Sequence, residues 1–321
     1  MPNANLDTDS HLHIEENVPL APFTSFRIGG PARFLIGAQN LRQLKGALRF
    51  AHKLNLPFCI LGGGSNLLIS DDGFPGVSIR LLMDRVTLSG GMVQVQGGFD
   101  LTTLVHRTVG WGLSGLESLA GIPGTVGGAV RGNAGAYGGA IGDVLATVSA
   151  LDATTLQTVT LRHDQCAFGY RDSRFKREPG LIVTGALLAL TPGNPDDIRT
   201  KVAETLAKRE AKQLSCDRSA GSFFMNPKVT DPGLIRRFEE DQGVRCRECR
   251  IPAGWLIDQA GLRSLSVGGA AVSHRHANYL VNTGTATAAE MVELARLVRR
   301  EVRLKLGVVL KEEVSTLGVV I

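Results

Sequence analysis

The sequence has no long apolar run, no block of like charges and no low-complexity segment. A membrane-spanning helix needs about 18 or more consecutive apolar residues, so we expect none in this chain. Aromatic residues make up only 5% of the sequence, and its lysines and arginines are scattered. This argues against the basic, aromatic-lined groove that single-stranded nucleic acid needs. The modest net charge of +5 fits an anionic small molecule better.

Signals for export and for metal binding are also missing. Residues 1–18 are polar and partly acidic, unlike a secretory signal or a transit peptide, so we expect a cytoplasmic protein. The five cysteines are an odd number and widely spaced, which favours reduced thiols. Cys246 and Cys249 form a single C-x-x-C, and His274 and His276, an i, i+2 pair on a predicted strand, do not complete a zinc set. We therefore predict no metal site.

The composition that is present is typical of a soluble globular protein, with 43% hydrophobic and 20% charged residues. A length of 321 residues is enough for two or three domains. Residues 33–38 predict a strand, and apolar positions at helical spacing predict a helix over residues 41–54 with Asn40 as its N-cap. Together with the strand candidates that follow, this pattern is typical of a small α/β unit.

Two further blocks follow along the chain. From about Asp72 the pattern changes to a hairpin, a helix that opens on Asp100 and several β-branched runs, which is typical of an α+β domain. A charged helix then leads to a third unit that begins near Gln213. In this last unit, Thr287 and Glu290 predict a capping box for the final helix.

A glycine-rich stretch at residues 121–139, GIPGTVGGAVRGNAGAYGG, contains eight glycines and no Lys, Asp or Glu. Such a run is either a linker or set of tight turns, or backbone whose N–H groups converge on phosphate oxygens. A second loop, GGGSN at residues 62–66, lies between two predicted strands and offers Ser65 and Asn66 as further donors. Two such loops in neighbouring domains favour a dinucleotide ligand.

The one literal G-x-G-x-x-G lies elsewhere, at Gly110, Gly112 and Gly115. A dinucleotide fingerprint needs a strand before these glycines and a helix after them. Here they follow a predicted helix and are better interpreted as its stop signal, so we do not predict a Rossmann fold. The sequence also has no G-x-x-x-x-G-K-[ST] loop and no G-x-S-x-G nucleophile elbow.

Three further signals are weak when each is taken alone. Arg171, in FGYRDSRFK, is an isolated arginine, and such a residue is more often a surface ion-pair partner than a catalytic group. Ser222, in SAGSFFMNP, has no evident histidine partner, so proton donation is a better interpretation than nucleophilic attack. Glu312 and Glu313 point to opposite faces of a predicted strand, so at most one of them can face an enclosed site.

Taken in order, these motifs resemble one family, the UDP-N-acetylenolpyruvoylglucosamine reductases, also called UDP-N-acetylmuramate dehydrogenases. The resemblance runs from about Phe23 to Gly318. It is carried by TSFRIGGPA, LGGGSNLLISDDGFPG, GLESLAGIPGTVGGAVRGNAGAYGG, FGYRDSRFK, SAGSFFMNP, PAGWLIDQAGL, GGAAVSHRHANYLVN and LKEEVSTLG.

The resemblance implies an α+β chain with an FAD-binding fold of the vanillyl-alcohol-oxidase type and a C-terminal α+β substrate-binding domain. We expect FAD-binding subdomain 1 at residues 1–72, completed by a strand within 307–321, subdomain 2 at 73–198 and the substrate-binding domain at 199–306. The implied activity is reduction of the enolpyruvyl ether of UDP-N-acetylglucosamine to UDP-N-acetylmuramate, for bacterial peptidoglycan synthesis. Bound FAD and NADPH as hydride donor are implied, with no nucleic-acid or membrane partner and with a monomeric chain.

The family's functional residues can be placed on this sequence. Its catalytic arginine falls on Arg171, its serine proton donor on Ser222 and its catalytic glutamate on Glu313. Residues that resemble substrate contacts are Tyr170, Lys212, Asn226 and Gln259. The implied FAD contacts are Gly62, Gly63, Gly64, Ser65, Asn66, Gly121, Ile122, Pro123, Gly124, Gly127, Gly128, Asn133, Gly135 and Gly138.

Some features vary within the family. The separation between Arg171 and Ser222, 222 − 171 = 51 residues, resembles the shorter form, which lacks a tyrosine-bearing insertion that closes over substrate. Leu214 stands where that form usually has proline, and Arg263 and Ser264 stand where Lys-Gly is usual. None of these positions is catalytic.

The implied chemistry explains the residue types. An enol ether accepts hydride only if its carboxylate takes up the developing charge, which calls for a fixed cation and hydrogen-bond donors. A guanidinium at Arg171 suits the cation, Glu313 helps only when protonated, and Ser222 would protonate the α-carbon. Two alternatives are an FAD oxidase of the same fold, which oxygen alone would reoxidise, and a non-catalytic flavin or nucleotide-sugar binding module. The second would lack one of these three residues, and all are present.

Overall fold

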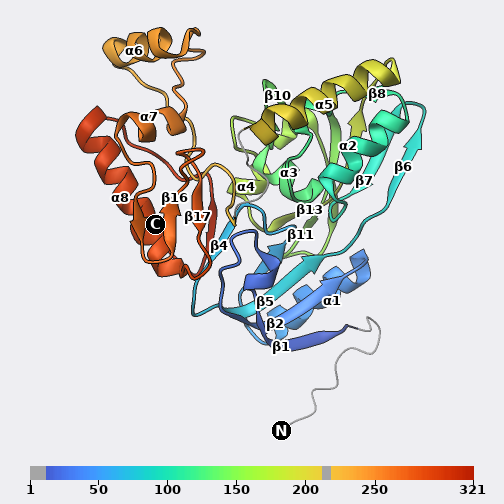
Figure 1. Cartoon of the computed structure of the whole chain (residues 1–321). Helices are drawn as coiled ribbons and strands as arrows, with labels where there is room; N and C mark the ends of the chain where they lie inside the picture. Colours follow the sequence, from blue (N-terminus) through green and yellow to red (C-terminus); the bar gives the residue numbers. More distant parts are fainter. Residues whose placement is uncertain (1–11, 212–217) are drawn as a thin grey trace. The chain divides into compact units, whose positions relative to one another are not determined.

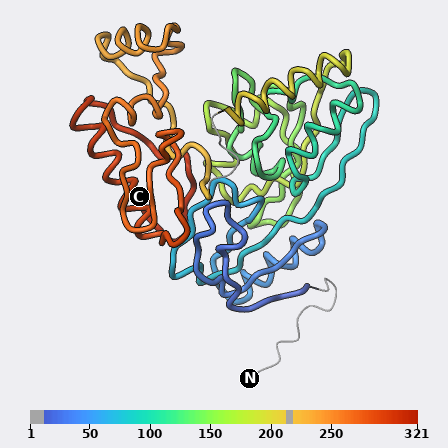
Figure 2. The backbone as a smooth tube through the Cα atoms, viewed as in Figure 1, coloured from blue at the N-terminus to red at the C-terminus, as the bar shows by residue number. Residues whose placement is uncertain are grey.

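The structure is a computed structural model that describes residues 12–211 and 218–321 (Figure 1). The chain divides into two compact units, and each is described by itself. Unit 1 comprises residues 1–18, 32–64 and 75–211, and unit 2 comprises residues 19–31, 65–74 and 212–321. The path of the backbone in Figure 2 shows that unit 2 joins early segments of the chain to the C-terminal third.

The first layer of unit 1 is a four-stranded sheet of order β1-β2-β5-β3, in which β3 and β5 run parallel. Asn40 caps helix α1 (Leu41–Lys53) as expected, because its side chain accepts a 3.0 Å hydrogen bond from the amide of Gln43. The helix buries Leu44 and Leu48 against the sheet in one apolar cluster. The strands are β1 (Ile14–Pro19), β2 (Pro31–Ala38), β3 (Phe58–Leu61) and β5 (Phe74–Leu81).

The second layer of unit 1 is an antiparallel five-stranded sheet of order β12-β11-β13-β7-β6. Its strands are β6 (Val86–Ser89), β7 (Met92–Gln96), β11 (Leu145–Asp152), β12 (Thr158–Arg162) and β13 (Leu181–Ala189). The helices of this layer are α2 (Leu101–Gly110), α3 (Val126–Gly132), α4 (Arg174–Arg177) and α5 (Pro195–Ala211), of which α3 packs against β13 and β7.

Short elements complete unit 1. They include the pairs β8 (Leu113–Ser114) with β14 (Thr191–Pro192), and β9 (Gly135–Ala136) with β10 (Gly139–Ala140). The 3-10 helices of the two units are η1 (Ala21–Phe23), η2 (Glu117–Leu119), η3 (Ile141–Val144) and η4 (His163–Cys166).

The literal G-x-G-x-x-G lies at the C-terminal end of helix α2. Asp100 caps the helix by accepting a 2.7 Å hydrogen bond from the amide of Thr103. The helix ends at Gly110, and Gly112 adopts a left-handed φ of +64° directly after it. These glycines therefore end a helix, as the sequence predicts, and do not open one.

Unit 2 is built on an antiparallel three-stranded sheet, β15-β16-β17, and three helices. The elements are β15 (Ser266–Val267), β16 (Ala270–Val272), β17 (Leu280–Asn282), α6 (Pro232–Gln242), α7 (Ala253–Gln259) and α8 (Ala288–Leu306). One apolar cluster forms its core, with Phe223, Phe224 and Leu256 fully buried in it. His274 and His276 lie between β16 and β17, so the prediction that they share a strand is wrong.

Two sets of groups cap the N-terminus of α8. Thr287 Oγ1 accepts a 3.1 Å hydrogen bond from the amide of Glu290, whose carboxylate accepts a 3.0 Å bond from the amide of Thr287. This is the predicted capping box. In addition, the carboxylate of Asp71 accepts bonds of 2.8 and 3.1 Å from the amides of Ala288 and Ala289. The loop after β4 (Leu67–Ile69) is thereby fixed to the start of α8.

The C-terminal segment returns to an early part of the chain. Strand β18 (Ser315–Leu317) pairs in parallel with β4, with Ser315 beside Leu67. The pairing places residues 315–317 beside residues 67–69. The expectation that this strand completes subdomain 1 stays a prediction, as do the domain boundaries drawn from the sequence. Within residues 12–211 and 218–321, no helix is long and apolar enough to cross a membrane.

Candidate active site

The two glycine-rich loops meet in unit 1. A Cβ added to Gly63 would lie 2.7 Å from the Cα of Gly124, and one added to Gly62 would lie 2.7 Å from Thr125 Oγ1. Such contacts are too short for any side chain, so glycine is required at this approach. Among the described residues, no acceptor is found for the backbone amides of Gly63, Gly64 and Gly124. This arrangement fits the backbone cradle that a dinucleotide pyrophosphate needs.

Other residues of the glycine-rich stretch serve the fold. The amide of Gly127 donates a 2.7 Å hydrogen bond to the carbonyl of Gly97, and a Cβ at Gly127 would lie 2.9 Å from that oxygen. The absence of a side chain at Gly127 thus allows α3 to approach the C-terminal end of β7 closely. The amide of Gly128 donates to Thr125 Oγ1 at 3.4 Å. The sequence predicted turns or a phosphate-binding backbone in this stretch, and it did not predict helix α3.

The remaining predicted FAD contacts lie on both sides of α3. Gly121 has a φ of +73°, Ile122 donates its amide to Leu119, and Pro123 is exposed. Gly135 begins β9, and Gly138 forms the turn to β10 with a φ of +89°. Their contacts with FAD stay predictions.

The side chain of Asn133 forms hydrogen bonds with backbone groups of unit 1. Asn133 ends α3 with a φ of +43° and is only 9% exposed. Its Nδ2 donates a 2.8 Å hydrogen bond to the carbonyl of Gly169, and its Oδ1 accepts a 3.1 Å bond from the amide of Gly142. Any contact of this residue with FAD is therefore expected from its backbone.

Tyr170 and Arg171 occupy the tip of a tight turn. Gly169 and Asp172 form an isolated antiparallel bridge with two backbone hydrogen bonds, of 2.9 and 3.2 Å, on either side of the tip. Arg171 has a left-handed φ of +56°, and its guanidinium lies 5.4 Å from the centre of the Tyr170 ring. The turn presents a cation and an exposed aromatic ring side by side, which suits recognition of an anionic ligand.

In unit 2, Ser222 and Glu313 lie on hydrogen-bonded neighbouring segments. The amide of Glu313 donates a 2.8 Å bond to the carbonyl of Phe223, and the amide of Met225 donates a 2.9 Å bond to the carbonyl of Lys311. Ser222 and Glu313 are both half-buried. The Nδ2 of Asn66, one of the predicted loop donors, binds the carbonyl of Glu313 at 3.1 Å. Two predicted catalytic residues are thus brought together by backbone bonds.

The two adjacent glutamates have different surroundings. Glu312 forms an ion pair with Arg299 of α8, and its carboxylate is therefore directed to that helix. Glu312 also bridges to Phe224, which fixes the register of this segment. The alternation expected from the sequence assigns Glu313 to the opposite direction. This supports Glu313 as the glutamate that addresses the site.

Asn278, which sequence reasoning did not assign a role, holds the Ser222 segment in place. It is 2% exposed. Its carbonyl accepts a 2.7 Å bond from the amide of Phe223, while its side chain exchanges bonds of 3.0 and 2.8 Å with the backbone of Phe224. The signal for this role is the asparagine in the motif GGAAVSHRHANYLVN. Once it is buried, its amide needs hydrogen-bond partners, and here the backbone supplies them.

Two of the predicted substrate contacts have structural partners. The Oδ1 of Asn226 accepts a 3.0 Å bond from the amide of Ala253, the first residue of α7. The side-chain oxygen of Gln259, the last residue of α7, accepts a hydrogen bond from Arg237 of α6. Lys212 lies outside the described residues.

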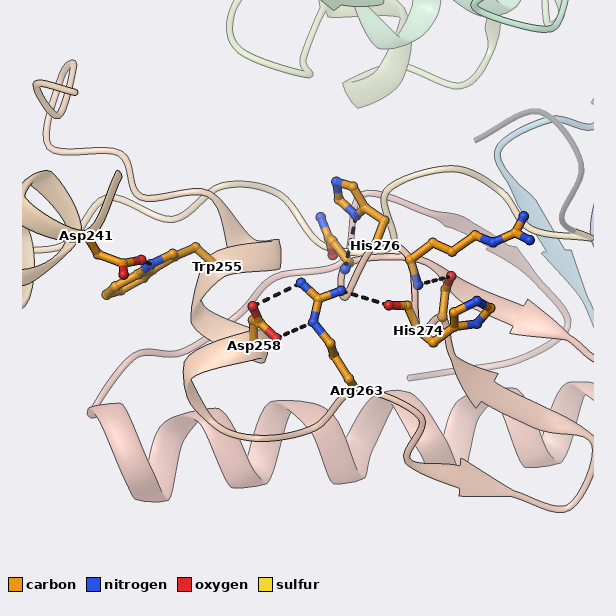
Figure 3. Close-up of polar contacts among 9 residues, drawn as sticks. Asp241, Trp255, Asp258, Arg263, His274 and His276 are labelled. Carbon is orange, nitrogen blue, oxygen red and sulfur yellow. Dashed lines mark hydrogen bonds and ion pairs between the residues drawn. The ribbon is translucent and has the colours of Figure 1, made fainter. Parts of the chain in front are cut away.

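Arg263, one of the positions that depart from the family pattern, fixes the loop between β16 and β17. Figure 3 shows its guanidinium between the carboxylate of Asp258 and the carbonyl of His274. The bond to the His274 carbonyl is 2.9 Å. Hydrogen bonding to Asp258 raises the pKa of Arg263 further. The same figure shows Trp255 of α7, whose Nε1 donates a 2.6 Å bond to Asp241 and thereby lowers the pKa of that carboxyl.

The structure describes four of the five cysteines. Burial raises the pKa of Cys59 and of Cys166 to about 11. Cys246 Sγ donates to the carbonyl of Arg250 at 3.3 Å, and Cys249 is exposed. Among the residues that the structure describes, no group of three or more His, Cys, Asp or Glu side chains is placed to hold a metal ion.

Comparisons with known protein families match two regions of the chain. Residues 32–160 match a family model described as an FAD binding domain. Residues 212–317 match the model of the UDP-N-acetylenolpyruvoylglucosamine reductase C-terminal domain. The chain is therefore an FAD-binding protein, and Gly63 and Gly124 lie inside the matched region.

Curated relatives match over nearly the whole length. A UDP-N-acetylenolpyruvoylglucosamine reductase from Synechococcus sp. is 38% identical, covering 99% of this chain and 96% of the relative. One from Carboxydothermus hydrogenoformans is 40% identical over 94% of this chain and 93% of the relative. The crystal structure of the reductase from Thermus caldophilus superposes with a TM-score of 0.77 at 34% identity, covering 95% of this chain and 99% of that one. The chain belongs to the UDP-N-acetylenolpyruvoylglucosamine reductase family, and the expected α+β fold class with an FAD-binding region is confirmed.

Proposed function

We propose that this chain reduces the enolpyruvyl ether of UDP-N-acetylglucosamine to UDP-N-acetylmuramate, a step of peptidoglycan precursor synthesis, and that Arg171, Ser222 and Glu313 carry the reaction. Family membership over the full chain supports the substrate and the use of NADPH and FAD. The observation that supports the residue assignment is the backbone pairing in unit 2 of the segment that contains Ser222 with the segment that contains Glu313, through the bond from the amide of Glu313 to the carbonyl of Phe223.

The glycine loops hold FAD in this account. The amides of Gly63, Gly64 and Gly124 would bind the pyrophosphate, which a carboxylate would repel. A side chain at Gly63 would collide with the backbone of Gly124 and push the two loops apart. Held by these loops, FAD would supply the redox chemistry that links the oxidation of NADPH to the reduction of the vinyl carbon of the substrate.

Arg171 stabilises the negative charge that develops on the substrate carboxylate. A guanidinium keeps its charge at all working pH values and grips a carboxylate through two parallel donors. Because the turn of Gly169 to Asp172 fixes the backbone of Arg171, part of this arrangement exists before the substrate binds. Preorganised donors of this kind are worth about 10²-fold or more in turnover.

Ser222 and Glu313 act on the same carboxylate and its α-carbon. Protonated Glu313 donates a hydrogen bond to the charge-bearing carboxylate, whereas an ionised Glu313 would repel it. Ser222 then gives its hydroxyl proton to the α-carbon of the enediolate. A hydroxyl is a weak acid, but the enediolate is a strong base, so the transfer is feasible.

Two finer expectations belong to the same proposal. The substrate is a nucleotide-activated sugar and the reductant is NADPH, both metabolites of the cytoplasm, and we infer that the protein works there. We also infer that the chain acts as a monomer, because both loops of the FAD cradle come from one chain. Sedimentation velocity of the FAD-loaded protein measures this directly.

The test of the proposed function is a product assay. FAD-loaded protein is incubated with NADPH and UDP-N-acetylenolpyruvoylglucosamine, and the sugar nucleotides are separated by mass. We expect NADPH oxidation that requires the substrate and a product two hydrogens heavier. Oxidation of NADPH at the same rate without substrate, with oxygen as the only acceptor, would instead support an oxidase.

A further inference from the structure

The turn that carries Arg171 is held in an uncommon conformation. Arg171 has a φ of +56°, which a residue with a long side chain rarely adopts outside glycine-type turns. Strain of this kind persists only where the surroundings determine the backbone. The described residues around Arg171 show three contacts that do so, each from a different residue of unit 1.

The first two contacts come from α3 and its end. Asn133 Nδ2 donates a 2.8 Å hydrogen bond to the carbonyl of Gly169, two residues before Arg171. Ser173, two residues after Arg171 and fully buried, donates its Oγ proton to the carbonyl of Arg131 at 2.6 Å. Two residues of the glycine-rich stretch at 121–139 thus form hydrogen bonds with the turn, one before its tip and one after it.

The third contact is made to Arg171 itself. Lys176 of the short helix α4 donates a 3.0 Å hydrogen bond from Nζ to the carbonyl oxygen of Arg171. The bond holds the peptide that follows Arg171 and thereby restrains the backbone of this residue on its C-terminal side. Phe175, which is 1% exposed, anchors α4 in the core, so Lys176 has a rigid base.

We propose that Asn133, Ser173 and Lys176 are positioning residues for Arg171, and that they hold its guanidinium in the orientation needed to stabilise the substrate carboxylate. This inference rests on the proposed role of Arg171. It gives Asn133 a part in aligning the reaction, besides its place in the FAD-facing stretch. An error of about 1 Å in such a group can lower a rate by roughly 10²-fold, so precise backbone support has kinetic value.

The test compares Lys176→Met with Lys176→Arg in the FAD-loaded protein. Flavin reduction by NADPH and flavin reoxidation by UDP-N-acetylenolpyruvoylglucosamine are measured separately by stopped flow. For Lys176→Met we expect reoxidation to slow by roughly tenfold. Flavin reduction and FAD occupancy should stay unchanged, because the hydrogen bond that is removed ends on the backbone of Arg171. Arginine can still donate to the carbonyl, so Lys176→Arg should recover most of the rate.

Arg174→Met is the matched control. It removes one positive charge from the same helix, and Arg174 pairs with Glu178 at 2.9 Å. Reoxidation at the wild-type rate in Arg174→Met supports the inference. An equal loss in Arg174→Met and Lys176→Met would show that net charge, and not support of the turn, sets the rate, and would overturn it. Equal losses in both half-reactions, with loss of FAD, would assign Lys176 a merely structural role and would also overturn it.

A double variant separates this inference from the proposed function. If Lys176 acts through Arg171, then Arg171→Gln/Lys176→Met should reoxidise no more slowly than Arg171→Gln alone. A further multiplicative loss in the double variant contradicts the inference. If Arg171→Gln itself reoxidises at the wild-type rate, the proposed function of Arg171 fails. Should Lys176→Met not fold, Ser173→Ala supplies the same cycle through the bond from Ser173 to the carbonyl of Arg131.

Discussion

The backbone amide of Glu313 donates a 2.8 Å hydrogen bond to the carbonyl oxygen of Phe223, the residue that follows Ser222. Together with the bond from the amide of Met225 to the carbonyl of Lys311, it joins a segment near the C-terminus to the segment that carries the proposed proton donor. Asn278 braces the same segment from the other side. Within unit 2, the two groups that would act on the α-carbon and the carboxylate therefore share one rigid frame.

Ser222→Ala tests the proton donor. We expect the variant to fold, because Ser222 is only half-buried and its backbone contacts remain. NADPH should reduce its flavin at the wild-type rate, whereas reoxidation by substrate should fall by about 10²-fold or more, by analogy with lost oxyanion donors. The two rates are measured in separate stopped-flow experiments. Wild-type reoxidation in this variant would show that another group protonates the α-carbon.

The adjacent glutamates supply a matched pair of variants. Glu313→Ala should slow substrate-dependent reoxidation by about 10²-fold. Glu313→Gln should retain more of the rate than Glu313→Ala, because its amide can still donate the hydrogen bond that a protonated carboxyl supplies. Glu312→Gln should lower the free energy of unfolding by about 0.5 kcal/mol through its ion pair with Arg299, and leave reoxidation unchanged. If Glu312→Gln is the slower enzyme, the two glutamates have been assigned in the wrong order.

Gly63→Ala tests the FAD cradle. The added Cβ would lie 2.7 Å from the Cα of Gly124, so one loop must move, and FAD binding should weaken by roughly tenfold. FAD occupancy is read from the absorbance of the purified protein and from titration of the apoprotein. The control is Gly110→Ala, in the literal G-x-G-x-x-G, where nothing lies within 4 Å of the added Cβ. Loss of FAD in Gly110→Ala, and not in Gly63→Ala, would restore the rejected dinucleotide fingerprint.

Glu290 makes the stability of unit 2 depend on pH. Hydrogen bonds from the backbone amides of Thr287 and Gly269 lower the pKa of Glu290 below its ordinary value of 4.5. A lowered pKa in the folded state adds stability above the unfolded-state value, and that stability is lost as the pH falls through the folded-state value. The difference in unfolding free energy between wild type and Glu290→Gln, from urea titrations, should therefore shrink from pH 6 to below pH 4. A difference that is constant over this range would exclude a contribution from the ionised carboxylate.

The structure also changes the expectation for Gly127→Val. Because the family resemblance implies that Gly127 contacts FAD, the sequence alone predicts that this variant lowers FAD occupancy. In the structure, Gly127 donates its amide to Gly97 and has no room for a Cβ, so valine would first separate α3 from the sheet. A loss of FAD in this variant would then report on folding, and for this reason Gly63→Ala is the better test.

Local signals in the sequence predicted much of the fold. Asn40, Asp100 and Thr287 each cap the helix that follows, because the bond spans only three residues and depends on side-chain chemistry alone. Helix α3 was missed because glycine disfavours helix by about 1 kcal/mol per residue. Burial of Val126 and Val130 in the core of unit 1 offsets this preference, and burial cannot be read from a short window.

The sequence predicted which residues belong to the candidate site, but it did not predict the hydrogen bonds that hold them in place. The order of motifs placed Arg171, Ser222 and Glu313 by resemblance. The bonds that hold them join Asn133 to Gly169, 36 residues apart, and Asn66 to Glu313, 247 residues apart. No spacing rule connects such positions, since they meet only after the sheets and helices have packed.

The most direct test of the central claim is the visible spectrum of the protein under anaerobic conditions, with two successive additions. The purified protein should show the absorbance of bound oxidised flavin, which NADPH should bleach. Addition of UDP-N-acetylenolpyruvoylglucosamine should then restore it in an amount equal to the UDP-N-acetylmuramate formed. A protein that binds no flavin, or a reduced flavin that recovers its colour only with oxygen, would contradict this account.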